Sequence, residues 1–339
     1  MKADINKTFI IAEAGVNHNG SLKKALKLID IAISAGANAI KFQTFKAENL
    51  ATDYAPKAEY QKYKLVKNET QFQMLKKLEF TEAMHKACFE KCKKKKIFFM
   101  SSAFDIESLN YLKKFKLSYF KVPSGEITNI PYLEVLGKFR KKIFLSTGMS
   151  NIYEIKKAIK TLKTNGTKKE NITLMQCTSA YPAPYNEINL NTIATLRNSL
   201  KLNIGFSDHS LGVHASIAAV ALGAKVIEKH LTLNKKLKGP DHRASLNPKE
   251  FKLMVDGIRV VEKMLGSKTK SITASEKKNI NIVRKSIVAT YDIKKNEKFT
   301  KENIACKRPG TGISPVFFKK ILGKRSIKNF KNGDLIKLN

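Results

Sequence analysis

The sequence has no tryptophan, only four cysteines and few acidic residues for its 339 positions. Four scattered cysteines do not make a disulfide framework, which fits a reducing compartment. Cys88 and Cys92 are four apart without a second cysteine pair, so a structural zinc site is not expected. No apolar run reaches about 18 residues, so we expect no membrane span. The stretch Phe9–Ala12 is too short for a signal peptide and is interrupted by Glu13, so a cytoplasmic location is expected.

Positive charge is in large excess. The 64 Lys and Arg outnumber 28 Asp and Glu, which gives a formal net charge of +36. Such a charge suggests a nucleic-acid partner. However, the basic residues are mostly lysines spread over nearly every segment, and the local run Lys91–Lys96 suits a solvated helix end. Without a helix-turn-helix or an aromatic-basic pattern, we expect no nucleic-acid partner, although that class stays as a competitor and the charge favours anionic substrates.

Short apolar runs alternate with stretches of helical periodicity, and 42% of the residues are hydrophobic. The expected strands are Phe9–Ala12, Ala39–Phe42, Ile97–Met100, Tyr119–Val122, Lys142–Leu145, Ile172–Gln176, Leu202–Phe206 and Lys225–Ile227. The expected helices are Leu22–Ala35, Glu82–Lys95, Ile106–Phe115, Tyr132–Phe139, Ile152–Lys163, Leu190–Leu200, Val213–Leu222 and Pro248–Leu265. Eight alternations predict a (β/α)8 TIM barrel over residues 1–266, with an open doubly wound sheet as the competing architecture.

The pattern changes after the barrel. Residues 267–283 are polar, lack a strong apolar period and are interpreted as a linker. Residues 284–339 contain the strand-like Ser286–Ala289 and turn-like segments at 294–297 and 332–334. This indicates a small, separate β-rich domain.

Polar residues gather where each expected strand ends. In chain order they are Glu13, Asn17 and His18; Lys41, Gln43 and Thr44; Ser101 and Ser102; Lys121, Ser124 and Glu126; Ser146 and Thr147; Thr178, Ser179 and Tyr181; Ser207, Asp208 and His209; Glu228, Lys229 and His230. A strand end satisfied by solvent would explain any one of these groups. In a barrel all eight ends lie on one face, where active sites are assembled, so the pattern predicts an active site there.

Two histidines are candidates for metal binding. His209 and His230 are 21 residues apart, one helix-strand unit, so their side chains would leave neighbouring strands at the same barrel mouth. Two neutral imidazoles suit a divalent ion, and Asp208 and Glu228 are expected to fix their tautomers. One catalytic and one structural histidine is the alternative. Three other histidines, His85, His214 and His242, are expected on the surface or in loops.

Lys41 and Lys121 lie in otherwise apolar strands, where a buried ammonium needs an anion. A phosphate or carboxylate ligand is one interpretation, with Ser102, Ser124, Ser146 and Ser207 completing its site. Two alternatives remain open. Each lysine could extend to solvent, or one could form a Schiff base as in barrel aldolases.

Several blocks resemble a known family. They are Ile11–Ser21, Lys41–Phe45, Val122–Glu126, Ser146–Met149, Gly205–Ser210, Val226–His230 and Gly239–His242. In this order they are similar to the bacterial sialic acid (N-acetylneuraminate) synthase family, which includes legionaminate synthases. The resemblance runs from about Phe9 to Ile336, and Arg284–Ser286 with Lys307–Ser314 look like the family's C-terminal antifreeze-like (β-clip, SAF) domain.

The resemblance implies condensation of phosphoenolpyruvate with an N-acyl mannosamine-type sugar to a nine-carbon 2-keto acid and phosphate. It implies Mn²⁺, or another divalent ion such as Mg²⁺, on His209 and His230 as a Lewis acid toward the sugar aldehyde. Glu126 would be the base that activates water, with Lys121 and Glu13 as further catalytic groups. The implied phosphoenolpyruvate site is Lys41, Lys121, Ser102, Ser124, Ser146 and Ser207, and the implied sugar site is Glu13, Gln43, Tyr181 and Asp241.

The resemblance also implies a domain-swapped homodimer, in which Arg308 reaches the partner's site and contacts the N-acyl group. Two positions depart from the family: Gln176 replaces a common histidine, and Ser179 stands where some members have asparagine, which leaves its phosphate contact open. N-Acetylmannosamine, giving N-acetylneuraminate, is the expected sugar. The alternative is 2,4-diacetamido-2,4,6-trideoxy-mannose, giving N,N'-diacetyllegionaminate; pseudaminate synthesis fits less well.

Overall fold

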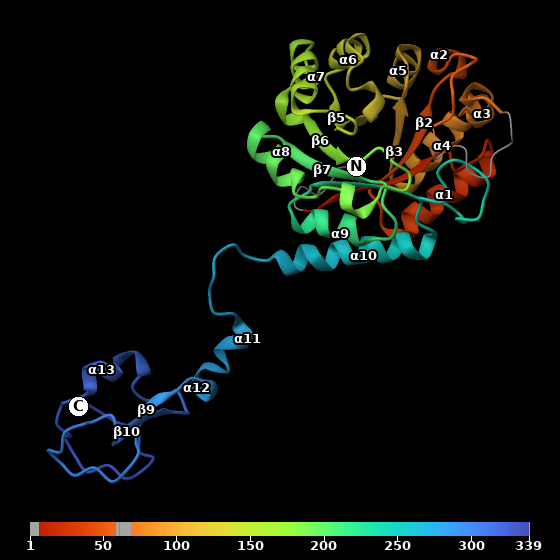
Figure 1. Ribbon diagram of the computed structural model, residues 1–339. Coiled ribbons are helices and arrows are strands. Elements are labelled where there is room, and N and C mark those ends of the chain that lie inside the picture. Colours follow the sequence, from red (N-terminus) through yellow and green to blue (C-terminus); the bar gives the residue numbers. More distant parts are fainter. Residues whose placement is uncertain (1–6, 59–60, 62–68, 339) are drawn as a thin grey trace. The chain divides into compact units, whose positions relative to one another are not determined.

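The computed structural model describes residues 7–58, 61 and 69–338 of the chain. The chain divides into two compact units, residues 1–266 and 267–339, and each is described by itself. In the first unit, eight parallel strands pair in the order β1 to β8 and close into a barrel, with helices around it (Figure 1). The predicted TIM barrel is therefore confirmed, and the open doubly wound sheet is wrong.

The strands begin close to the predicted positions but most continue one to three residues further. They are β1 (Phe9–Gly15), β2 (Ala39–Thr44), β3 (Phe98–Ala103), β4 (Tyr119–Val122), β5 (Lys142–Ser146), β6 (Ile172–Cys177), β7 (Asn203–Asp208) and β8 (Val226–His230). Hydrogen bonding to parallel neighbours carries the strands into the polar segments; for example, Gln43 pairs with Ser102 across β2 and β3. Some polar residues, such as Lys41, Ser102 and Ser146, thus lie on strands, while others, such as Ser179 and His209, follow the strand ends.

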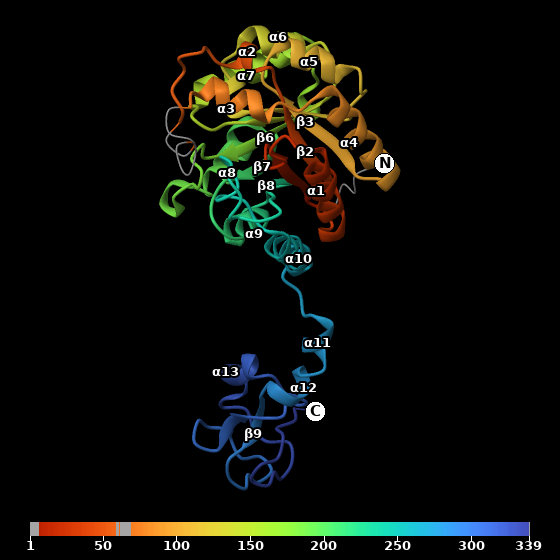
Figure 2. The ribbon, with the colours of Figure 1, turned by 90° about the vertical axis from the view of Figure 1, so that its right-hand side faces the viewer.

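Helices cover the outside of the strands, as Figure 2 also shows. They are α1 (Leu22–Ala35), α2 (Ala47–Leu50), α3 (Gln71–Leu78), α4 (Glu82–Lys95), α5 (Ile106–Lys113), α6 (Ile130–Gly137), α7 (Ile152–Thr164), α8 (Thr192–Leu200), α9 (His214–Ala221) and α10 (Pro248–Leu265). Local signals set their ends. Helix α10 begins at Pro248, and Asn247 just before it forms a capping box with Glu250. Helix α1 is ended by Gly36, which has a φ of 87°. Helix α10 packs against α9 and α1.

The helices α2 and α3 were not predicted from the sequence. Both are short, and α3 begins with a capping box in which Thr70 accepts from the backbone of Gln73. Their apolar side chains pack with residues that follow β1 and β2 in a small cluster built on Val16, Phe45, Met74 and Leu78. Helix α3 does carry local signals, a capping box and the buried residues Met74 and Leu78 four apart, but helices this short depend on tertiary packing, which is why both were missed.

The strands alternate between two apolar environments. Outward residues such as Ile10, Phe42 and Phe206 pack under the helices. Inward residues near the strand starts fill the lower half of the barrel; these are Phe9, Ile11, Ala39, Met100, Tyr119, Phe144, Met175 and Val226. Tyr119 and Phe144 stack there with ring centroids 5.3 Å apart. This lower half is a packed core, as expected of a barrel of eight strands.

The second unit is small and rich in turns. Strands β9 (Ser286–Ala289) and β10 (Ile304–Lys307) pair antiparallel over a separate apolar cluster that includes Ile293, Phe299 and Phe330. The expectation of a β-rich C-terminal domain is confirmed. The segment predicted as a linker contains two single-turn helices, α11 (Ala274–Lys277) and α12 (Ile280–Val283), and a third, α13 (Phe318–Ile321), follows β10. None of the helices in the described part of the chain has both the length and the apolar character needed to cross a bilayer.

Candidate active site

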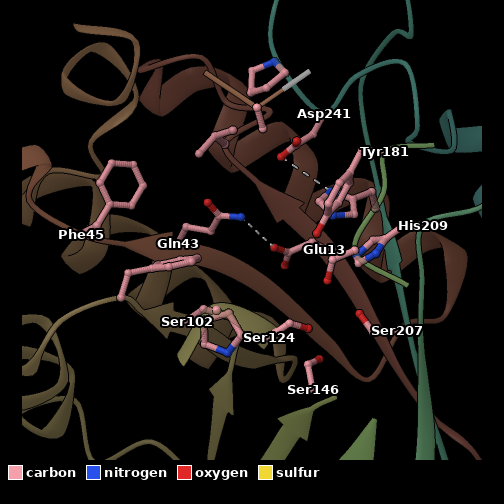
Figure 3. A pocket seen from close by; sticks show the side chains of 18 of the residues that line it. Glu13, Gln43, Phe45, Ser102, Ser124, Ser146, Tyr181, Ser207, His209 and Asp241 are labelled. Carbon is pink, nitrogen blue, oxygen red and sulfur yellow. Dashed lines mark hydrogen bonds and ion pairs between the residues drawn. The ribbon is translucent and has the colours of Figure 1, made fainter. Parts of the chain in front are cut away.

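The side chains that point into the barrel change from apolar to polar toward the strand ends. Two residues beyond Tyr119 stands Lys121, and two beyond Phe144 stands Ser146. Because side chains on one face of a strand recur every second residue, these polar groups continue the same inward column. They line a cavity of about 420 Å³ at the mouth of the barrel (Figure 3). The predicted site residues that line it are Glu13, Lys41, Gln43, Ser102, Lys121, Ser124, Ser146, Ser179, Tyr181, Ser207, His209, His230 and Asp241.

Lys41 is buried within an ion-pair network. Its Nζ lies 2.9 Å from Glu13 Oε2 and donates to Ser102 Oγ at 2.8 Å. Burial alone would lower the pKa of Lys41, but the carboxylates of Glu13 and Glu228 outweigh it and raise the pKa. Burial raises the pKa of Glu13 to about 7, although the Lys41 ammonium acts in the opposite direction. Lys41 therefore stays charged inside the cavity, and Glu13 can gain or lose a proton near neutral pH.

Glu228 holds the second lysine. Lys121 Nζ donates to Glu228 Oε1 at 2.8 Å, and Ser207 Oγ donates to the same oxygen at 2.9 Å. Burial would raise the pKa of Glu228, but Lys121 and Lys41 outweigh it and lower the pKa to about 2. Both lysines are thus buried and paired rather than extended to solvent, so that alternative is wrong. An anion entering here would meet two ammonium groups that are already fixed in place.

Hydroxyl groups form the wall beside the lysines. Ser146 Oγ is buried and has no hydrogen-bond partner in the described part of the chain. Ser124 Oγ accepts from the Gly148 backbone N–H at 3.1 Å. A Cβ on Gly148 would lie 2.2 Å from Ser179 Oγ and 2.7 Å from Ser124 Oγ, so only glycine fits there. The unpaired hydroxyl of Ser146 is a site where an acceptor oxygen of a ligand can bind.

His209 and His230 face the cavity together, with ring centroids 5.5 Å apart. His209 Nδ1 donates to the Thr178 carbonyl at 2.8 Å, so Nε2 is the ring nitrogen left for a ligand. His230 Nδ1 is buried with no hydrogen-bond partner among the described residues, and Asp241 Oδ2 is 4.0 Å away. Burial, and then the nearby His209, lower the pKa of His230 well below its ordinary value, so its imidazole is neutral.

This pair has the chemistry of a metal site. A neutral imidazole with an orphaned nitrogen, His230, beside a second imidazole, His209, suits a divalent ion, which would displace any proton from the nitrogen that it binds. Residues 7–58, 61 and 69–338 contain no group of three or more His, Cys, Asp or Glu arranged to hold a metal. The two histidines would therefore share an ion with water or substrate oxygens. The Tyr181 ring lies against His209, with centroids 4.1 Å apart.

The expectation that Asp208 and Glu228 fix the histidine tautomers is wrong. The side chain of Asp208 points away from the cavity. There its Oδ2 lies 2.9 Å from Lys229 Nζ, and its carboxylate accepts hydrogen bonds from the hydroxyls of Ser210 and Ser216. Its buried partner Lys229 stands between the inward positions 228 and 230, so strand alternation places this pair outside the barrel. Glu228, in turn, binds the lysines.

One predicted site residue, Glu126, is not brought to the cavity in the described structure. Glu126, in the single turn η2 (Ser124–Glu126), accepts from Asn129 Nδ2 at 2.7 Å, and it does not line the cavity in the described structure. The turn carries Ser124 to the cavity and directs Glu126 to the helix α6 side. Arg308 belongs to the second unit, where it is exposed and its Nε donates to the Val283 carbonyl at 3.0 Å.

Sequence reasoning missed several features of the site. Cys177 lines the cavity with Sγ 3.7 Å from His209 Nδ1, whereas the neighbouring Gln176 turns away and donates to the Ile188 carbonyl at 3.2 Å. Period-two counting from Met175 would have found Cys177. His85 is buried in helix α4, not on the surface or in a loop as expected, whereas His242 lies in a loop with its ring buried and His214 is exposed. His85 bonds Thr44 Oγ1 at 2.8 Å, and His242 bonds Thr232 Oγ1 at 2.7 Å.

Comparison with known proteins agrees with this architecture. The NeuB family model matches residues 28–270, and the SAF domain model matches residues 284–339. An N,N'-diacetyllegionaminic acid synthase of Campylobacter jejuni is 51% identical over 98% of this chain and 100% of its own. An enzyme of the same name from Legionella pneumophila is 43% identical over 96% and 92%.

Among solved structures, an N-acetylneuraminic acid synthetase from Leptospira borgpetersenii superposes with a TM-score of 0.71. It is 35% identical and covers 81% of this chain and 90% of its own. Matches of this extent and identity show common ancestry rather than a shared fold alone. The chain belongs to the NeuB (sialic acid synthase) family of phosphoenolpyruvate-dependent condensing enzymes and carries their C-terminal SAF domain.

Proposed function

We propose that this enzyme condenses phosphoenolpyruvate with 2,4-diacetamido-2,4,6-trideoxy-mannose to form N,N'-diacetyllegionaminate and inorganic phosphate. C3 of phosphoenolpyruvate bonds to the aldehyde carbon, water adds at C2, and the C2–O bond to phosphate breaks. The observation that carries the reaction is that two fixed ammonium groups, Lys41 and Lys121, and two imidazoles, His209 and His230, line one cavity. Such a cavity suits an acidic ligand beside an aldehyde.

The lysine side would bind phosphoenolpyruvate. Lys41 and Lys121 would contact its carboxylate and phosphate, and the buried Ser146 hydroxyl, which lacks a partner within the described structure, would donate to one of its oxygens. The remaining hydroxyls proposed for this half are Ser102, Ser124, Ser179 and Ser207. Because Glu228 already fixes Lys121, little side-chain order is lost when the anion arrives.

The histidine side would bind the sugar aldehyde. We propose that His209 and His230 hold Mn²⁺ or a similar divalent ion, which acts as a Lewis acid toward the aldehyde oxygen when bound. Tyr181, Gln43 and Asp241 would orient the sugar chain. Glu13, whose pKa burial raises to about 7, is suited to exchange a proton with a sugar hydroxyl. Since Glu126 does not line the described cavity, we assign no role to it.

The choice of sugar departs from the principal expectation, N-acetylmannosamine. The relatives at 51% and 43% identity bear the name legionaminic acid synthase, whereas the sialic acid synthetase structure is 35% identical. These names support the alternative substrate that the sequence left open.

A direct experiment tests the proposal. The purified enzyme is given phosphoenolpyruvate, Mn²⁺ and each sugar separately, phosphate release is followed, and the product mass is determined. We expect the mass of N,N'-diacetyllegionaminate with the diacetamido sugar and slower turnover with N-acetylmannosamine. Phosphate release that needs no sugar, or a pyruvate adduct trapped on Lys41 or Lys121 by borohydride, would contradict the proposal.

We propose further that the active enzyme is a homodimer in which Arg308 of one copy contacts the N-acyl group in the partner's cavity. Arg308 is exposed on its own unit, with its Nε on the Val283 carbonyl. Arg308→Ala should raise KM for the sugar while KM for phosphoenolpyruvate stays close to the wild-type value. Sedimentation of the full chain tests the dimer itself.

A further inference from the structure

Among the described residues, one side of the cavity is lined by apolar side chains. Side chains from α2, from α3 and from the segments that follow β2 and β3 meet there, and we call them the apolar wall: Phe45, Leu50, Met74, Leu75 and Phe104. Phe45 and Phe104 pack edge to face with centroids 6.1 Å apart. The reaction as proposed above uses none of these residues.

The apolar wall is not a closed core. Phe45 and Met74 are buried, but Leu50, Leu75 and Phe104 are only partly buried, and all three line the cavity. Their apolar surface is thus open to a ligand. Apolar surface in a concave site adds to binding affinity only when an apolar group of the ligand covers it.

The wall lies at the far end of the cavity from the histidines. Figure 3 shows Phe45 across the cavity from His209, with Gln43 and Glu13 drawn between them. Gln43 Nε2 lies 3.5 Å from Glu13 Oε1, so these two polar groups mark the middle of the site. A sugar whose aldehyde carbon lies at His209 and His230 would direct its other end toward the apolar wall.

We propose that the apolar wall selects the sugar by contact with two methyl groups, that of C6 and that of the acyl group on the C4 nitrogen. This inference rests on the proposed function and names the residues that would distinguish its sugar. N-Acetylmannosamine carries hydroxyl groups at both positions. A hydroxyl held against Leu75 or Phe104 loses water without gaining a hydrogen bond, whereas a methyl group gains apolar contact.

The experiment compares two sugars on one enzyme. Wild type should use 2,4-diacetamido-2,4,6-trideoxy-mannose with a kcat/KM about 100-fold above that for N-acetylmannosamine, since each methyl group is worth about 10-fold or more. Leu75→Gln should reduce this ratio about 10-fold, mainly through a higher KM for the diacetamido sugar, with KM for phosphoenolpyruvate unchanged. Leu75→Met is the matched control and should keep the ratio, because it conserves volume and apolar character.

Leu50→Gln repeats the test from a different helix, so that a fold defect in one variant does not decide the result. Thermal unfolding of each variant confirms that it is folded. An unchanged ratio in both folded glutamine variants would overturn the role of the apolar wall while the proposed function stands. A wild-type preference for N-acetylmannosamine would contradict the sugar named in the proposed function. Absence of phosphate release with either sugar would instead contradict the proposed function.

Discussion

The barrel interior has two halves built on the same strands. In the lower half, inward residues such as Phe144 and Met175 fill the space with rings and a thioether. In the upper half, the next inward residues, Ser146 and Cys177, line an open cavity. A side chain that packs the core and one that lines the cavity are therefore only two positions apart on the same strand. The comparison teaches that stability and reactivity occupy successive layers of one column of side chains.

The two halves also solve different physical problems. The lower half buries apolar area, which stabilises the fold without directional bonds. The upper half buries charge, and each buried charge needs a partner. Glu228 meets this need by pairing with both Lys41 and Lys121. Substitutions in the two halves should therefore have different effects.

The largest expected effect is on the histidine pair of the upper half. His209→Ala and His230→Ala should each lower kcat/KM about 10³-fold, because several kcal/mol of charge stabilisation at the aldehyde would be lost. A chelator should abolish wild-type phosphate release, and added Mn²⁺ should restore it. His214→Ala, which changes an exposed ring, is the control. Full turnover in both variants would refute the metal assignment.

A change in the lower half should act on stability alone. Phe144→Ala should lower the free energy of unfolding by about 3–5 kcal/mol, because it leaves a void beneath the stacked Tyr119 ring. Chemical denaturation measures this loss. At a temperature where the variant is folded, KM for phosphoenolpyruvate should stay near the wild-type value; a large rise would mean that the two layers are not independent.

A third prediction concerns burial outside the barrel interior. Burial lowers the pKa of His85 to about 4. The unfolded chain takes up this proton near pH 6.5 and the folded chain only near pH 4, so stability is lost as the pH falls from 6.5 toward 4. The loss is about 3 kcal/mol for one such group. Burial also lowers the pKa values of His18 and His242 to about 4, so His85→Gln should remove only its own share of the stability loss in that window. The exposed His214→Gln should leave the loss unchanged.

The smallest effect is expected two residues beyond Phe144. Ser146→Ala removes a buried hydroxyl that has no hydrogen-bond partner in the described residues, so the free energy of unfolding should change by less than about 0.5 kcal/mol. KM for phosphoenolpyruvate should rise about 10-fold, because a hydrogen bond to an anion is worth about 1.5 kcal/mol or more. Steady-state kinetics and denaturation on the same sample separate the two effects. A destabilised variant with unchanged KM would reverse the assignment of this layer.

Much of this arrangement could be predicted from the sequence. The alternation of apolar runs and helical periods predicts the eight strands, and the helices Leu22–Ala35 and Pro248–Leu265 match their predicted ends because capping residues mark them. The polar strand ends predict the mouth of the barrel. These signals are local, and the closed barrel turns them into one site.

Other features depend on contacts that no local signal records. Helix α3 is stabilised because Met74 and Leu78 pack with Val16 and Phe45, which lie far from them in the chain. His85, on an amphipathic helix, is expected on the surface or in a loop, yet the hydroxyl of Thr44 binds it in the interior. Glu228 was assigned to the histidines because it is close to them in sequence. Its carboxylate instead pairs with Lys41 and Lys121, which other strands bring to it when the barrel closes.

The division of the cavity bears on how inhibitors would achieve selectivity. A compound that fills only the lysine side imitates phosphoenolpyruvate and offers no reason to prefer this enzyme over others that bind the same metabolite. A single molecule that joins an acidic head to a small branched hydrocarbon tail would reach both Lys121 and the apolar wall. Because such a molecule loses its translational freedom only once, the tail would add affinity and discrimination together.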